Sequence, residues 1–161
     1  MTNGSKAPGG GPHGYKPPPQ STGWGGGQNK RTNDSRLTKE WLEKNIQFEN
    51  PDENIFSVVA EHAAKEVHSG SANKRTQLRR FYDELTMWND RVEQEPVKYQ
   101  ELAPFIKMLK AKVVYAESRG HVDQTFTALF SRCLNEIKDP KTLRLAKLFL
   151  EAFMGFYRQY D

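Results

Sequence analysis

The chain has 161 residues, enough for one domain of ordinary size, and carries a formal net charge of +4. One cysteine and four scattered histidines exclude an intramolecular disulfide and a recognisable zinc-ligand set, and no apolar run approaches the roughly 20 residues of a membrane span. We therefore expect a soluble protein of the reducing cytoplasm, with no cofactor and no membrane partner, and the mild basicity favours an anionic partner.

The first 36 residues differ in composition from the rest of the chain. Nine of the 12 glycines and five of the nine prolines fall within residues 1–27, a segment that can bury almost no apolar surface. We expect residues 1–36 to form a disordered tail and residues 37–161 to form the folded domain. Aromatic and cationic tail residues could contact single-stranded RNA without folding, although such segments more often serve as linkers. These residues are Tyr15, Lys16, Trp24, Lys30 and Arg31.

Helix signals then follow one another, and no segment shows the alternation of a strand. Thr38 can cap a short first helix, whose apolar residues are Trp41, Leu42 and Ile46. A second helix is predicted from about Pro51 to Val67, because the sequence NPDE at residues 50–53 combines an N-cap residue, a first-position proline and a third-position glutamate. Gly70 follows its end.

The next two predicted helices each carry one apolar stripe. The third contains the sequence KRTQLRRFYDEL, residues 74–85, and stops at Pro96. Its stripe consists of Leu78, Phe81, Tyr82, Leu85, Trp88 and Val92. The fourth helix begins near Gln100, tolerates Pro104 near its first turn, and ends before a left-handed turn at Gly120. Its stripe consists of Leu102, Phe105, Ile106, Leu109, Val113 and Ala116.

Two further helices complete the predicted fold. The fifth spans roughly Val122 to Lys138, and its apolar residues are Phe126, Leu129, Phe130, Cys133, Leu134 and Ile137. Asp139 and Pro140 read as the cap and first residue of a sixth helix, with apolar residues over about half of its circumference, so it should pack against several others. Those residues are Leu143, Leu145, Ala146, Phe149, Leu150, Phe153, Met154, Phe156 and Tyr157. Short connections between five or six helices predict an all-α antiparallel bundle.

Catalytic and metal-binding patterns are missing from this sequence. His62 and Glu66 lie one helical turn apart, but the second histidine of a zinc-protease motif is absent. Cys133 falls on an apolar helix side and is better interpreted as a small buried hydrophobe than as a nucleophile. Asp83 and Glu84 lie among arginines, where surface ion pairs are expected. The sequence therefore predicts no enzyme; a small enzyme with an unrecognised site is one alternative.

The basic residues at the start of the third helix divide between its sides. At roughly 100° per residue, Arg75 and Arg79 lie about 60° and 100° from Leu78, on one flank of the apolar stripe. Arg80 lies near roughly 200°, on the far side, and Lys74 stands at the helix start, where exposed amides favour an anion. Solvated helix faces explain these charges as well as an RNA-binding surface does.

Three segments carry a more specific resemblance. They are KRTQLRRFYDEL at residues 74–85, LKAKVVYAESRG at residues 109–120 and LFLEAFMGFYR at residues 148–158. In this order and spacing they resemble the Csm2 family, the small helical subunit of type III-A CRISPR effector complexes. The resemblance covers roughly residues 57–160 and does not include the Gly/Pro-rich tail.

The resemblance implies a non-enzymatic, all-helical subunit that serves antiviral defence. Several copies would stack into a filament, with a basic surface along the channel of the guide–target duplex. The implied partners are the CRISPR guide RNA, the target RNA, the other Csm subunits and further copies of the chain. By resemblance, the RNA-binding residues are Lys74, Arg75, Arg79, Arg80, Lys110, Lys112 and Arg119. Helix geometry favours Arg75 and Arg79 among them. A stand-alone helical module would instead co-purify with protein only.

Overall fold

The computed structural model describes residues 4, 5, 9 and 35–160. Within residues 35–160 the chain forms six α-helices, joined by short π- and 3-10 segments, and no strand, which confirms the expected all-α fold. The predicted tail and its aromatic and cationic side chains lie almost entirely outside the described residues. None of the described helices is both long and apolar enough to cross a membrane.

The six helices follow closely on one another in the chain. They are α1 (Lys39–Asn45), α2 (Ala60–His68), α3 (Arg75–Gln94), α4 (Tyr99–Ser118), α5 (Gln124–Glu136) and α6 (Pro140–Tyr157). A π-helical turn (Ile55–Val59) leads into α2, and 3-10 turns precede α4 (Pro96–Lys98) and follow α6 (Arg158–Tyr160).

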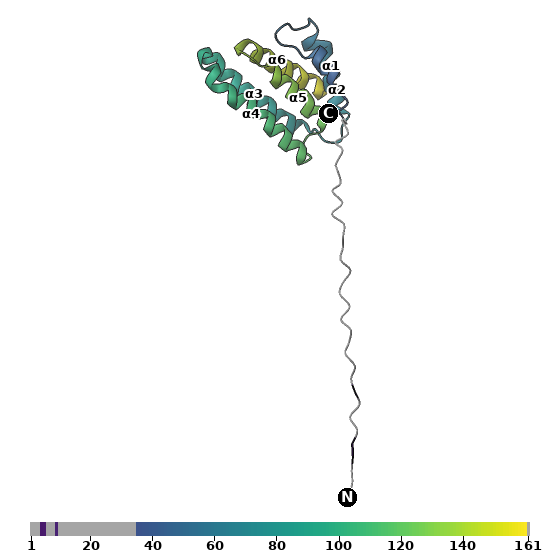
Figure 1. Ribbon diagram of the computed structural model, residues 1–161. Coiled ribbons are helices and arrows are strands. Elements are labelled where there is room, and N and C mark those ends of the chain that lie inside the picture. Colours follow the sequence, from purple (N-terminus) through teal and green to yellow (C-terminus); the bar gives the residue numbers. More distant parts are fainter. Residues whose placement is uncertain (1–3, 6–8, 10–34, 161) are drawn as a thin grey trace. The chain divides into compact units, whose positions relative to one another are not determined.

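Helix α6 occupies the middle of the bundle and packs against both α2 and α3. Figure 1 shows α3 and α4 side by side along one edge, with α5 and α6 between this pair and α1 and α2. Helix α5 packs mainly against α4, and the broad apolar face predicted for α6 is buried on several sides. The fully buried aromatic rings of the core are Phe48, Phe126, Phe130, Phe149 and Phe153.

Three predicted helix ends are confirmed, two by side-chain hydrogen bonds and one by backbone conformation. The Thr38 hydroxyl accepts from the Trp41 amide at 3.2 Å. At the start of α6, the Asp139 carboxylate accepts from the Thr142 amide at 2.7 Å and forms a reciprocal capping box, which lowers the pKa of Asp139. Gly120 adopts the left-handed conformation after α4, with φ of 70°. Local side-chain chemistry therefore sets these helix ends.

The start of the second helix differs from the prediction. The segment at residues 51–54 is not helical, and the first turn after it is the π-helical one. The Asp52 carboxylate accepts the Asn54 amide at 2.8 Å, so it closes a local turn. Short acidic side chains compete with the helix in this way. Regular α-helix begins only at Ala60, nine residues later than the predicted Pro51.

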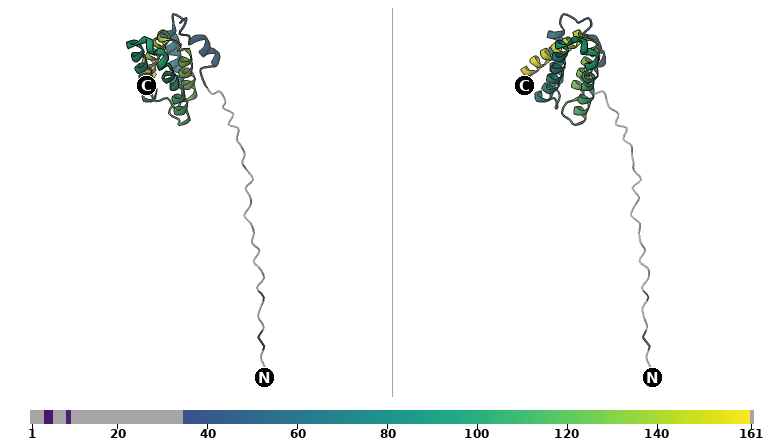
Figure 2. Two further views of the ribbon diagram at one scale, coloured as in Figure 1. Left: turned by 60° about the vertical axis from the view of Figure 1, so that its left-hand side comes forward. Right: turned by 90° about the vertical axis from the view of Figure 1, so that its left-hand side faces the viewer.

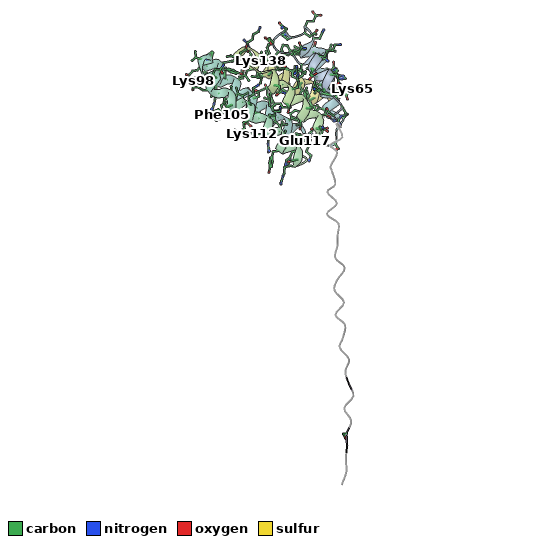
Figure 3. The ribbon with its side chains drawn as sticks, in the orientation of Figure 1. Lys65, Lys98, Phe105, Lys112, Glu117 and Lys138 are labelled. Carbon is green, nitrogen blue, oxygen red and sulfur yellow. The ribbon has the colours of Figure 1, made fainter. Side chains whose placement is uncertain are left out.

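Phe105 is a second difference from the prediction. It was placed in the buried stripe of the fourth helix, but its side chain is 49% exposed and stacks on the Trp88 ring, with centroids 5.6 Å apart. Among the described elements, α4 packs mainly against α3 and α5. Their contact buries Ile106, Leu109 and Val113 and leaves the Phe105 side of the helix partly exposed. In Figure 3, Phe105 lies on the side of the bundle away from α1.

Asn73 joins four parts of the fold at the loop between α2 and α3. It is fully buried and left-handed, with φ of 66°. Its side chain donates to the Val67 carbonyl at 3.0 Å, near the end of α2, and accepts from the Asp123 amide at 2.7 Å, at the start of α5. Its own carbonyl accepts from the Tyr157 hydroxyl at 2.5 Å, at the end of α6. Since α3 begins two residues later, this junction fixes where α3 starts against α6.

Replacement of Asn73 tests the junction. Asn73→Gly keeps the left-handed backbone but strands two buried polar groups, so we expect a loss of about 2 kcal/mol in unfolding free energy. Asn73→Ala should lose about 1 kcal/mol more, because a Cβ is strained at this φ. Urea denaturation of both variants measures this, with Gln94→Ala at the exposed end of α3 as the control. Equal stability of the wild type and Asn73→Gly would contradict the assignment.

Candidate nucleic-acid interface

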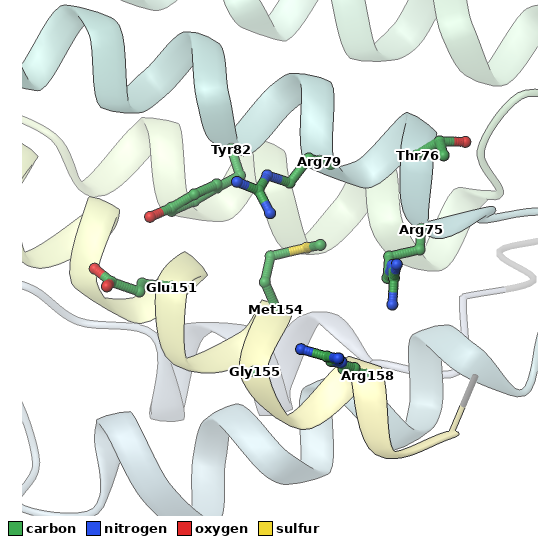
Figure 4. A pocket seen from close by; sticks show the side chains of 8 residues that line it. All are labelled: Arg75, Thr76, Arg79, Tyr82, Glu151, Met154, Gly155 and Arg158. Atoms are coloured by element: carbon green, nitrogen blue, oxygen red, sulfur yellow. The ribbon is translucent and has the colours of Figure 1, made fainter.

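An open groove of about 490 Å³ lies between the start of α3 and the end of α6. Its lining residues are Arg75, Thr76, Arg79, Tyr82, Glu151, Met154, Gly155 and Arg158. Figure 4 shows the Arg75 side chain directed from α3 toward α6 and the Arg79 side chain extended along α3 beside Tyr82. Met154 and Arg158 lie on the other side of the groove. The two views of Figure 2 place the C-terminal end of α6 near the edge of the bundle, so the groove lies at the surface.

The groove is electropositive because three arginines face one glutamate. That glutamate, Glu151, accepts a hydrogen bond from Lys147 at 2.6 Å, which raises the lysine pKa and offsets the carboxylate charge. The first turn of α3 carries no acidic residue, so the positive end of its helix dipole adds to the field. No described carboxylate forms an ion pair with Arg158. The arrangement suits an anionic group that enters from solvent.

Arg79 is held in place by its own helix neighbours. Its Nε lies 3.0 Å from the Asp83 carboxylate, one turn along α3, and its guanidinium carbon lies 5.8 Å from the centre of the Tyr82 ring. The side chain is still 64% exposed. An exposed pair of this kind contributes little stability, and its other guanidinium nitrogens can donate to a ligand.

Arg75 and Arg79 both line the groove, on the one flank of the helix that they were predicted to share. The other two cations of the segment do not line it. Arg80 is exposed and lies outside the groove lining. Lys74 occupies the N-cap position of α3, also exposed and outside the lining. The segment therefore presents two arginines to the groove and two cations elsewhere.

The basic residues of α4 lie apart from the groove. Lys112 forms an ion pair with Glu84 of α3, and the Lys110 ammonium lies 3.4 Å from the Asn135 side chain of α5. Arg119 is exposed at the C-cap of α4. The Lys112–Glu84 and Arg79–Asp83 pairs confirm that Asp83 and Glu84 form surface ion pairs. Lys110, Lys112 and Arg119 therefore do not extend the arginine groove.

Lys107 has a structural role that the sequence pattern did not indicate. Its ammonium donates to the carbonyls of Leu134 and Ile137, the second at 2.6 Å, and so satisfies the C-terminal end of α5. Partial burial lowers the pKa of Lys107. This lysine links α4 to α5, and its ammonium is directed at backbone carbonyls and not at solvent.

Sequence reasoning missed the α6 wall of the groove. Arg158 is the last residue of the segment LFLEAFMGFYR, and Met154 and Gly155 precede it there. The apolar periodicity of α6 assigned Met154 to the core, and Tyr82 was assigned to packing. Both are half-buried and pack against the core, but both also line the groove. An arginine that ends an apolar helix was the one available signal.

Cys133 and His62 take part in packing contacts. Cys133 is fully buried, and burial raises the pKa of its thiol far above the usual range. The described residues contain no group of three or more His, Cys, Asp or Glu that could hold a metal ion. His62 instead packs against the Trp41 ring, with centroids 5.0 Å apart.

Comparison with known proteins adds a family likeness. The model of the family described as Csm2 Type III-A matches residues 50–161, about 70% of the chain. The match includes both walls of the groove and begins after α1. No curated protein and no solved structure matches the chain.

Burial of Cys133 predicts a slow thiol reaction. In the native protein at pH 8, iodoacetamide should modify Cys133 at least about a hundredfold more slowly than in urea, because access requires opening of the core. Mass spectrometry of timed samples measures both rates. Comparable rates in the two conditions would show that α5 opens easily or packs otherwise.

Proposed function

Because the chain belongs to the Csm2 family, the small subunits of type III-A CRISPR complexes, we propose that it binds RNA by the sugar–phosphate backbone in the groove between α3 and α6. The subunit is non-catalytic in this proposal. Its RNA partners are the CRISPR guide RNA and the target RNA, and it acts in the cytoplasm in antiviral defence.

The observation that carries this proposal is the convergence of Arg75, Arg79 and Arg158 on one groove from two helices. Planar guanidinium groups match phosphate oxygens in pairs and hold their charge at any physiological pH. Contacts to phosphates do not depend on base identity. A subunit that must accept any guide and any target needs this kind of contact.

The energetics of such a site favour weak binding by one subunit. Each phosphate contact releases about one counterion or slightly less, so affinity falls steeply as salt rises. Several copies along one RNA would each add an intramolecular contact, and avidity would supply the total affinity. The proposal therefore includes further copies of the chain beside the other Csm subunits.

An exposed apolar face on α4 supports contact with a neighbouring subunit. Phe105 and Met108 are each 49% exposed and Tyr115 is 66% exposed, on a helix that lies at the edge of the bundle. Apolar side chains that gather on a surface mark sites of protein contact. Since this face belongs to α4, a neighbour could cover it and leave the groove between α3 and α6 open.

Catalysis is assigned to other subunits in this proposal. Csm2 proteins are structural subunits, and the one cysteine of this chain is buried with a raised thiol pKa. The ionisable groups that line the groove are three arginines, Tyr82 and Glu151, and the carboxylate of Glu151 is ion-paired with Lys147. In this proposal these groups hold an anion and take no part in chemistry.

Charge reversal in the groove tests the proposal. Arg75→Glu with Arg79→Glu should weaken binding of target RNA by the assembled complex about tenfold and reduce the salt slope by about one to two units, because two phosphate contacts are lost. Fluorescence anisotropy over a range of salt measures both. The fold should survive, because both side chains lie at the surface.

The matched control is Lys39→Glu with Lys44→Glu on α1. It makes the same change in net charge at two exposed positions outside the groove. Binding should change little, since only general attraction is reduced. Equal losses in the two double variants would indicate a non-local charge effect, and unchanged binding by the groove variant would contradict the site.

A further inference from the structure

Gly155 has no structural reason to be a glycine. It lies in the last full turn of α6, and among the described glycines only Gly120 has a positive φ. A Cβ built on Gly155 would meet no atom within 4 Å. Glycine destabilises a helix relative to alanine. Alanine at this position would therefore stabilise the fold. The reason for a glycine is then contact with a molecule outside the chain.

The open space above Gly155 is the arginine groove. Gly155 lines it beside Met154. Arg158, at the start of the 3-10 turn that follows α6, lies on the same wall, and Arg75 and Arg79 lie on the opposite one. In Figure 4, Gly155 lies on the α6 ribbon between Met154 and Arg158. A side chain here would fill space that faces the cations. Glycine is the residue that lets a ligand approach backbone closely.

The groove also contains an apolar surface that a phosphate alone would not use. The Tyr82 ring and the Met154 thioether lie next to the arginines, and both are half-buried. Its volume of about 490 Å³ falls in the range of sites for small ligands. A nucleotide has both matching parts, a charged phosphate and a flat apolar base. In a duplex the base is stacked on both faces and cannot reach such a surface.

We propose that this groove seats one unpaired RNA nucleotide. Its phosphate lies among Arg75, Arg79 and Arg158, its base rests against Tyr82 and Met154, and the strand passes over Gly155. This rests on the proposed RNA-binding function and deepens it by choosing an unpaired nucleotide over a duplex. Base identity does not matter, because stacking surfaces accept any base.

Two substitutions of Gly155 separate stability from binding. Gly155→Ala should raise the melting temperature of the full chain by about 3 °C through helix propensity and weaken binding of an eight-nucleotide single-stranded RNA severalfold. Gly155→Leu places a larger side chain in the groove and should weaken binding of the same RNA at least tenfold. Circular dichroism measures melting, and fluorescence anisotropy at low salt measures affinity.

The comparison ligand is an eight-base-pair duplex that contains the same strand. Wild-type chain should bind the single strand at least fivefold more tightly than the duplex at equal salt, and Gly155→Leu should remove this difference. The matched control is Gln100→Leu, an exposed position of α4 outside the groove. It should leave both affinities unchanged.

Equal affinity of the wild type for single strand and duplex would overturn the proposal. Unchanged RNA affinity of Gly155→Leu would also overturn it, and if that variant then failed to co-purify with the other Csm subunits, the groove would be a protein interface. The double variant Arg75→Glu with Arg79→Glu distinguishes a failure of the unpaired-nucleotide proposal from a failure of the proposed RNA-binding function. If that pair loses RNA while Gly155→Leu does not, the proposed function stands and only the unpaired nucleotide fails.

Discussion

The buried carboxamide of Asn73 holds together the end of the bundle on which the groove is built. This side chain forms hydrogen bonds with the end of α2 and the start of α5. The backbone carbonyl of Asn73 accepts a hydrogen bond from the Tyr157 hydroxyl at the end of α6. Arg36 closes the same junction, because it pairs with the Asp123 carboxylate and donates to the Glu66 carbonyl. Buried polar groups are costly unless all are satisfied, so this network specifies one arrangement of the helix ends.

The groove takes its geometry from this junction. Arg75 follows Asn73 by two residues, and Arg158 follows Tyr157 by one, so the Asn73–Tyr157 hydrogen bond sets the spacing of the two cationic walls. Three arginines therefore line one open groove, and Arg79 is paired there with Asp83 of its own helix. In this way a structural constraint inside the bundle determines which cations share a groove at its surface.

Helix ends were predicted correctly where a single residue determined them. Thr38, Asp139 and Gly120 act through neighbours within a few residues, which a sequence displays directly. The helix start predicted from the capping pattern at residues 50–53 was wrong, because the Asp52 carboxylate accepts the Asn54 amide and closes a local turn. Phe105 matched the helical period but lies at the edge of the bundle, where Trp88 of α3 covers only part of its ring. Helical periodicity predicts the side of the helix on which a residue lies. It does not predict which other elements pack against that side.

The sequence by itself determined the helices, their apolar faces and the shared direction of Arg75 and Arg79, because these depend on rotation along one helix. Only the tertiary structure brought Arg158 opposite them and left Gly155 open. It also joined Lys107 to backbone carbonyls of α5 and Lys112 to Glu84 of α3. Those outcomes depend on which helices pack together and on how far one helix is shifted along the other. That is decided by long-range contacts such as the hydrogen bond between Asn73 and Tyr157, 84 residues apart, which no local pattern encodes.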